Sequence, residues 1–184
     1  FVITGQPRSA GLGPTLGALS IERVYRFFPR NIYFMLDDYR YRWPVRVLWH
    51  VIDAFSKHGA NVVRRVLSDE HPDIVITHNL KGVGLRIPGV IQSMGIPHVH
   101  IMHDLQLVTP SGLRLFGQER EMWFVKPLYA LYRAVCRARL GTPAMVISPS
   151  QFLIDEYRKV GFFERADVRF VPNPSPKPSG VLRD

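Results

Sequence analysis

Cysteine is nearly absent from the 184-residue sequence, which contains Cys136 alone. A single cysteine cannot form a disulfide within the chain, and it cannot build a cysteine-rich metal site. This excludes the small secreted domains that several disulfides hold together. A reducing compartment suits such a sequence, so we expect a cytoplasmic location.

Long hydrophobic runs are missing as well. No stretch reaches the roughly 18 apolar residues of a membrane-spanning helix, and no short apolar segment has the basic start and small-residue cleavage site of a secretory signal. The chain also lacks a starting methionine, and its opening FVIT run predicts a strand. We therefore expect no membrane span, and we expect the chain to be a piece of a longer protein.

Acidic residues are the minority, with 15 Asp and Glu against 24 Lys and Arg, a net charge of +9. Such a charge favours phosphate-bearing partners, whether nucleotide, nucleic acid or anionic lipid. The densest mixture of arginine and aromatic residues lies in residues 23–46. No nucleic-acid recognition motif accompanies it, so we predict a solvated, partly packed connection there and no nucleic-acid partner.

Strand-like and helix-like segments alternate along the chain. Helical periodicity covers residues 43–67, with a weak point at His58 and Gly59, and helices are also predicted at 83–94, 127–140 and 150–160. Apolar runs at 74–77, 98–102, 144–148 and 167–171 predict strands, and the run at 74–77 is expected to be buried on both faces. The helix over 43–67 is expected to pack on the sheet.

This alternation predicts an α/β fold, a doubly wound and mainly parallel sheet with helices on both faces in three layers. The domain is expected to cover residues 1–172, and the proline- and serine-rich residues 173–184 are expected to form a linker. Parallel strands share one carboxyl edge, where open α/β sheets bind ligands. The polar residues at the carboxyl ends of the predicted strands, which would gather there, are His78, Asn79, His103, Asp104, Ser148 and Ser150.

The segment HVHIMHD, residues 98–104, approaches the ligand run H-x-H-x-D-H of metal-dependent hydrolases. Met102 stands where that run needs an aspartate, and His98 and His100 share one face of a strand, so no metal is expected. A metal-dependent hydrolase remains an alternative hypothesis. The glycine pairs at 82 and 84 and at 11 and 13 do not form a dinucleotide fingerprint, so no dinucleotide cofactor is expected.

The predicted helix at 127–140 has one apolar side and a basic flank. With the apolar residues 122–125 before it, this helix could dock on an anionic membrane surface. A helix packed on the core with a solvated basic face is the favoured interpretation. The basic residues are Lys126, Arg133, Arg137 and Arg139.

Four segments, read together, resemble successive blocks of the amino-terminal domain of family 4 glycosyltransferases. They are PDIVITHNLKGVG, GIPHVHIMHDLQLVTPSG, VISPSQFLIDEYRKVGF and VRFVPNP, and the match extends over residues 43–174. The resemblance implies the Rossmann-like, acceptor-side half of a GT-B architecture. It implies a hexosyltransferase-type enzyme that moves a sugar from a nucleotide-sugar donor to a glycan or lipid-linked acceptor, with retention at the anomeric carbon and without a metal or other cofactor.

By the same resemblance, His103 is the expected catalytic residue, and His78, Asn79, Asp104 and Ser150 are expected to line the substrate cleft. The sequence departs from the family in two places. The glycine-rich loop after the family's first strand is absent, and so is the donor-binding domain with its Glu-x7-Glu motif. We therefore expect the isolated chain to be inactive, with a cell-envelope acceptor and a peripheral place on the inner membrane face for the parent. A non-catalytic binding module remains another hypothesis.

Overall fold

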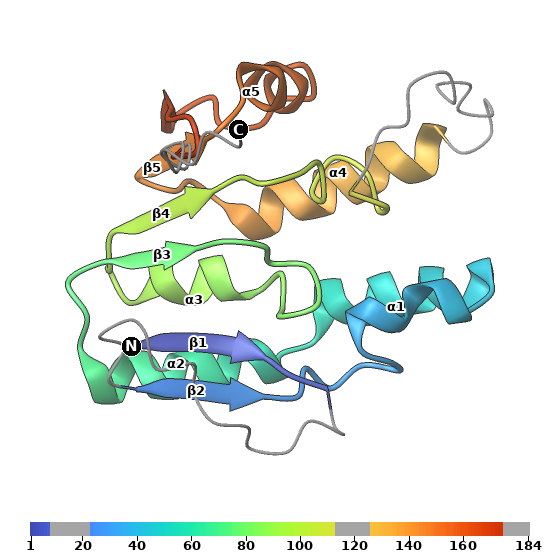
Figure 1. The fold of residues 1–184 in the computed structure, drawn as a ribbon, viewed down its shortest axis with the longest axis horizontal. Helices are drawn as coiled ribbons and strands as arrows, with labels where there is room; N and C mark the ends of the chain where they lie inside the picture. The colour runs from blue at the N-terminus through green and yellow to red at the C-terminus, as the bar shows by residue number, and fades with distance from the viewer. Residues whose placement is uncertain (8–22, 113–125, 175–184) are drawn as a thin grey trace, which may run out of the picture.

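The computed structural model describes residues 1–7, 23–112 and 126–174. Strand β1 (Val2–Gly5) pairs in parallel with β2 (Val24–Phe27). Strands β3 (Val75–Thr77), β4 (His98–Ile101), β5 (Met145–Ser148) and β6 (Asp167–Phe170) form a parallel four-stranded sheet in that order. Figure 1 shows β1 between β2 and the four-stranded sheet. The strand order therefore runs from β1 to β2 on one side and from β1 towards β3 on the other. The predicted parallel α/β architecture is confirmed.

The helices lie close to their predicted positions. The long helix predicted over 43–67 is two helices, α1 (Trp43–Phe55) and α2 (His58–Glu70), separated just before the predicted weak point. Helix α3 (Ile87–Ser93) begins later than expected because Gly82 and Gly84 take positive φ angles in the turn before it. Helices α4 (Lys126–Leu140) and α5 (Gln151–Arg158) match the predictions, and Gly161, with φ of 79°, follows α5. No helix among the described residues is long and apolar enough to cross a bilayer.

The core lies on one face of the four-stranded sheet. Each of the crossovers between β3 and β6 steps to the next strand in the same direction, and right-handed crossovers then place α3, α4 and α5 on a common face. Val146 and Cys136 are fully buried there. The prediction that 74–77 is buried on both faces is wrong, because Ile74 and Ile76 point to the opposite face and are exposed.

The arginine-rich segment 23–46 is more ordered than a connection. It contains β2 and a 3-10 helix, η1 (Met35–Arg40), which the sequence analysis did not anticipate. The Tyr33 ring stacks on Tyr41 and on Trp49, with ring centres 4.1 and 5.6 Å apart, and the Trp49 indole donates to the Tyr33 carbonyl. Aromatic packing therefore holds this segment against α1. The proposed linker 173–184 lies almost wholly outside the described residues.

Two histidines of β4 are buried around one threonine of β3. The Thr77 hydroxyl lies 2.8 Å from Nε2 of His98 and 2.9 Å from Nδ1 of His100. Burial lowers the pKa of His98 to about 4 and, with the charge of the neighbouring histidines, lowers the pKa of His100 to about 3. Both imidazoles are therefore neutral near pH 7, and they serve as polar parts of the core.

We predict that these histidines make the fold acid-sensitive. The pKa of His100 is about 3 in the fold against 6.5 for the free side chain, so its stabilising contribution is complete above pH 6.5 and is lost as the pH falls toward 3. Replacing His100→Asn keeps an amide atom near Thr77 and removes the titration. Between pH 7 and pH 5 the variant should lose about 2 kcal/mol less unfolding free energy than the parent chain, measured by urea denaturation.

The matched control is His71→Asn at the exposed end of α2. An equal change in this variant would show that the effect is not specific to His100. An unchanged pH dependence in His100→Asn would show that His100 is charged or solvated in the fold.

Two glycines in helices offer a second test of the packing. A Cβ added at Gly59 would lie 2.3 Å from the Val83 carbonyl oxygen, because the start of α2 touches the turn after β3. A Cβ added at Gly89 in α3 would meet nothing within 4 Å. Gly59→Ala should therefore lower the unfolding free energy by about 1–3 kcal/mol, and Gly89→Ala should raise it by about 0.5–1 kcal/mol, in thermal melts. Equal effects would contradict the described packing.

Candidate functional site

Two histidines meet at the carboxyl edge of the sheet. His78 follows β3 and His103 follows β4, which is its parallel neighbour. Nδ1 of His78 lies 2.8 Å from Nε2 of His103, and the rings stack with centres 5.1 Å apart. Both side chains are exposed. Partial burial and the proximity of His103 lower the pKa of His78.

The neighbouring polar residues are joined by Gln106. Its Nε2 donates to Oδ1 of Asn79 over 2.8 Å, and its backbone N–H donates to Oδ1 of Asp104 over 2.8 Å. Its Oε1 accepts from the Lys81 backbone N–H over 2.9 Å. The turns after β3 and β4 are therefore connected through one side chain, which places four of the expected site residues, His78, Asn79, His103 and Asp104, in one cluster.

Gln106 was missed by the sequence analysis. It is almost fully buried although it lies in the apolar run Leu105, Leu107 and Val108. A polar residue within such a run is a usable signal, since a buried amide needs partners. The Tyr132 hydroxyl also donates to the Gln106 carbonyl, so α4 supports the same turn.

A buried carboxylate of α1 holds the turn after β3. Both Asp53 carboxylate oxygens accept from the Gly82 backbone N–H at 3.2 Å, and burial raises the pKa of Asp53 to about 7. Lys81 donates to the Pro110 carbonyl over 2.7 Å and lies 5.8 Å from the centre of the Trp49 ring, and burial lowers its pKa. The turn is thus held by α1 on one side and by the 105–112 loop on the other.

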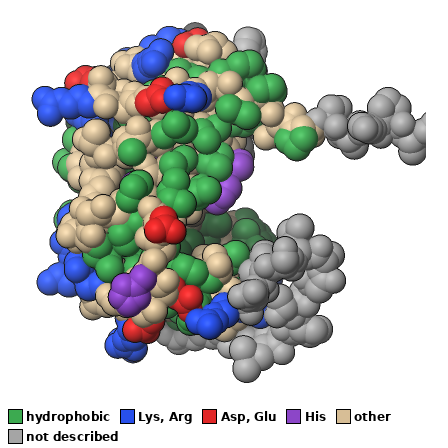
Figure 2. Space-filling model, turned by 90° about the vertical axis from the view of Figure 1, so that its left-hand side faces the viewer, with side chains coloured by type: hydrophobic (Ala, Val, Ile, Leu, Met, Phe, Trp, Pro, Cys, Tyr) green, Lys and Arg blue, Asp and Glu red, His purple; other side chains and the backbone are tan. Residues whose placement is uncertain are grey.

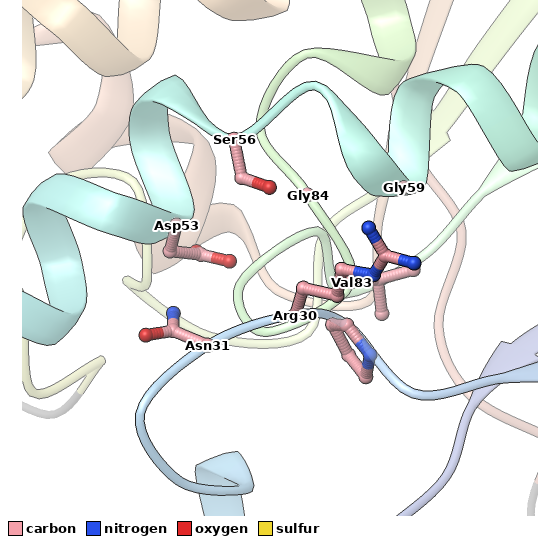
Figure 3. Close-up of a pocket in the computed structure, with 8 residues that line it drawn as sticks. Arg30, Asn31, Asp53, Ser56, Gly59, Val83 and Gly84 are labelled. Carbon is pink, nitrogen blue, oxygen red and sulfur yellow. The ribbon is translucent and has the colours of Figure 1, made fainter.

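Figure 3 shows Asp53 and Ser56 above Arg30 and Asn31 around a small cavity. The space amounts to about 10 Å³, which is close to the room that one water molecule needs. A sugar cannot enter it. Asp53 therefore holds the turn that contains Lys81 and Gly82. The exposed pair His78 and His103 remains the candidate site.

Ser150 lies at the end of the next strand, β5. It is the residue that precedes α5, and its side chain makes no capping hydrogen bond. The Ser148 hydroxyl holds the backbone of Ser150, because it donates to the Ser150 carbonyl over 2.8 Å and accepts from its N–H over 3.2 Å. Ser150 shares the carboxyl edge with the other candidates, and its contact with a substrate stays a prediction.

The comparison with known families agrees with this arrangement. The family model described as Glycosyltransferase Family 4 matches residues 18–175. The chain belongs to glycosyltransferase family 4. A curated relative from Klebsiella pneumoniae, named an uncharacterized 42.6 kDa protein in a cps region, is 26% identical over 144 residues. The alignment covers 78% of this chain and 38% of that relative, so the family 4 domain spans well under half of the relative's length.

The HVHIMHD segment of this family 4 domain does not converge on a metal site. His98 and His100 are buried around Thr77, whereas His103 lies at the exposed edge with His78. No group of three metal-ligating side chains comes together in the described parts of the domain. Side chains alternate between the two faces of a strand, so His98 and His100, two positions apart, share one face. His103 lies beyond the end of β4 and at an odd spacing from them, so it does not share that face.

We predict that Gln106 positions the site of the family 4 domain. In Gln106→Leu the Lys81 N–H loses its partner inside the protein, so the unfolding free energy should fall by about 1–3 kcal/mol. The imidazole NMR signals of His78 and His103 should also shift, because the two turns are no longer tied.

The matched control is Gln92→Leu. Gln92 also bridges two elements, donating to the Leu140 carbonyl over 2.9 Å, but it lies away from the carboxyl edge. This variant should lose comparable stability and leave both imidazole signals in place. If the two variants shift those signals equally, Gln106 is only a stabilising residue.

Proposed function

We propose that the domain is the acceptor-side half of a retaining glycosyltransferase that transfers a sugar from a nucleotide-sugar donor to a glycan or lipid-linked acceptor. Family membership supports the transferase class. The observation that carries the proposal is the hydrogen-bonded, exposed pair His78 and His103 at the carboxyl edge of a parallel sheet, where ligands of such sheets bind. The donor-binding domain is proposed to lie in the rest of the parent protein, without which this chain is inactive.

In this proposal His103 is the catalytic residue. The contact with His78 occupies Nε2 of His103 and leaves Nδ1 for the reacting groups, and the tautomer in which His78 donates gives Nδ1 of His103 the proton that this role needs. A donor there stabilises the charge that develops on the leaving phosphate as the glycosidic bond to the nucleotide breaks. The released phosphate takes the acceptor's proton as the new bond forms on the same face.

The remaining residues are proposed to hold the acceptor. Asn79 uses its Oδ1 for Gln106 and keeps its NH2 group for a sugar hydroxyl. Asp104 is half-buried and accepts from the Gln106 N–H through one oxygen, so the other can accept from a hydroxyl. Ser150 is proposed to border the cleft from β5. No metal or other cofactor is needed for these roles, since the nucleotide sugar is itself a substrate.

The proposal is tested with the longer parent protein. His103→Ala should reduce kcat roughly 100-fold or more while binding of the nucleotide sugar changes little, because the lost interaction acts on the developing charge. Turnover of nucleotide sugar measures the effect, and His71→Ala is the control at an exposed histidine away from the site.

An unchanged kcat in His103→Ala would remove His103 from catalysis. A parent that binds no nucleotide sugar would instead support the non-catalytic binding module. Further proposals are that the parent works in the cytoplasm at the inner face of the membrane, where its acceptor is attached, and that the net charge of +9 favours that surface.

A further inference from the structure

Helix α1 presents apolar side chains to solvent. Its outer face consists of Trp43, Val47, Leu48, Val51 and Phe55, which are 74%, 38%, 52%, 49% and 53% exposed. The polar residues of the helix lie on the other side: Asp53 is buried, and Arg46 and His50 are half-buried. A surface helix of a water-soluble domain has the reverse arrangement. The expectation that the 43–67 region packs its apolar side on the sheet is therefore wrong for α1.

Specific contacts fix this orientation. Asp53 accepts from Gly82, and the Trp49 indole donates to the Tyr33 carbonyl over 2.9 Å. The His50 ring meets the Tyr132 ring edge-on at 5.9 Å, and burial with the nearby Lys81 charge lowers the pKa of His50 to about 4. Turning the outer face inward would break these bonds, so the exposure of the apolar side is a property of the fold.

Neighbouring elements also expose apolar side chains. In η1, Leu36 is 70% and Tyr39 is 76% exposed, and in α4, Leu128 and Leu131 are 48% and 62% exposed. Helix α4 runs beside α1 in the same direction, since Tyr132 lies against His50 and Arg139 lies 5.1 Å from the Phe55 ring centre. Several large apolar side chains exposed on neighbouring elements mark an interaction site.

Basic side chains accompany this surface on α4. Helix α4 carries four cations and no acidic residue, and in η1 the two acidic residues Asp37 and Asp38 pair with Arg40 and Arg46. Apolar and aromatic side chains next to arginine and lysine match the interface of an anionic bilayer, where apolar groups enter the acyl boundary and cations meet the headgroups. Arg139 lies over the Phe55 ring of α1 and Lys126 begins α4, whereas Arg133 donates to the Val108 carbonyl and Arg137 to the Val160 carbonyl beside α5.

We propose that the outer face of α1, together with the exposed residues of η1 and the start of α4, docks on an anionic lipid bilayer. Figure 1 shows the amino ends of α1 and α4 on the side to which the strand arrowheads point, which is the side of His78 and His103. Docking would bring that site to the headgroup level. The link to a lipid-attached acceptor rests on the proposed function, whereas the docking itself does not.

The test measures co-sedimentation of the chain with vesicles at low salt, without any sugar donor. Vesicles contain phosphatidylcholine and phosphatidylglycerol in equal amounts, or phosphatidylcholine alone. The chain should bind the anionic vesicles, and added salt should weaken the binding. The double variant Val47→Gln and Val51→Gln should weaken the binding roughly tenfold or more, because two apolar side chains that would enter the bilayer are lost. Glutamine is a good helix former, so α1 should persist, as circular dichroism can verify.

Phe55→Gln and Phe152→Gln form a matched pair, since the two rings are 53% and 55% exposed in different helices. Only Phe55→Gln should reduce vesicle binding. Two binding results would overturn the proposal: a folded chain that does not bind anionic vesicles, or an α1 double variant that binds them as well as the unsubstituted chain does. Dimerisation of the unsubstituted chain through this face, seen as a change in mass caused by the α1 substitutions, would also overturn it. Each leaves the His103 experiment unaffected.

Discussion

The buried amide of Gln106 is the contact on which the candidate site depends. Strands β3 and β4 end side by side because they pair in parallel, but pairing alone does not set the shape of the turns that follow. Gln106 binds the Asn79 side chain and the Lys81 backbone, and its own N–H binds Asp104. Its burial makes these bonds costly to break, since water cannot replace them without opening the core.

Helix α1 links the candidate site to the exposed apolar face that this helix carries. Its polar side is used inside the protein, where Asp53 holds Gly82 and the Trp49 indole holds the Tyr33 carbonyl. That use leaves the apolar side facing outward. The same contacts that shape the turn after β3 therefore create the apolar surface beside it. Figure 2 views the molecule from the opposite, amino-end side of the strands and shows that apolar side chains also gather around a hollow there.

The buried and exposed histidines illustrate the difference that one strand position makes. His98 and His100 lie within β4 and are neutral, buried and bonded to Thr77. His103 lies just beyond the strand, and it is exposed and bonded to His78. For the closely spaced histidines of residues 98–104, a metal site was only an alternative hypothesis. The sheet divides them into a core pair and an edge residue, so their chemistry differs although their residue type is the same.

The sequence alone determined the order of strands and helices, the shared edge of His78, Asn79, His103 and Asp104, and the family resemblance, because periodicity and strand ends are local properties. Only the tertiary structure decided which side of α1 is buried, that Ile74 and Ile76 are exposed, and that Gln106 and Asp53 hold the turns. Those outcomes depend on contacts between residues far apart in the chain, such as Asp53 with Gly82 and Tyr132 with Gln106. No local pattern records them, since burial belongs to the assembled fold.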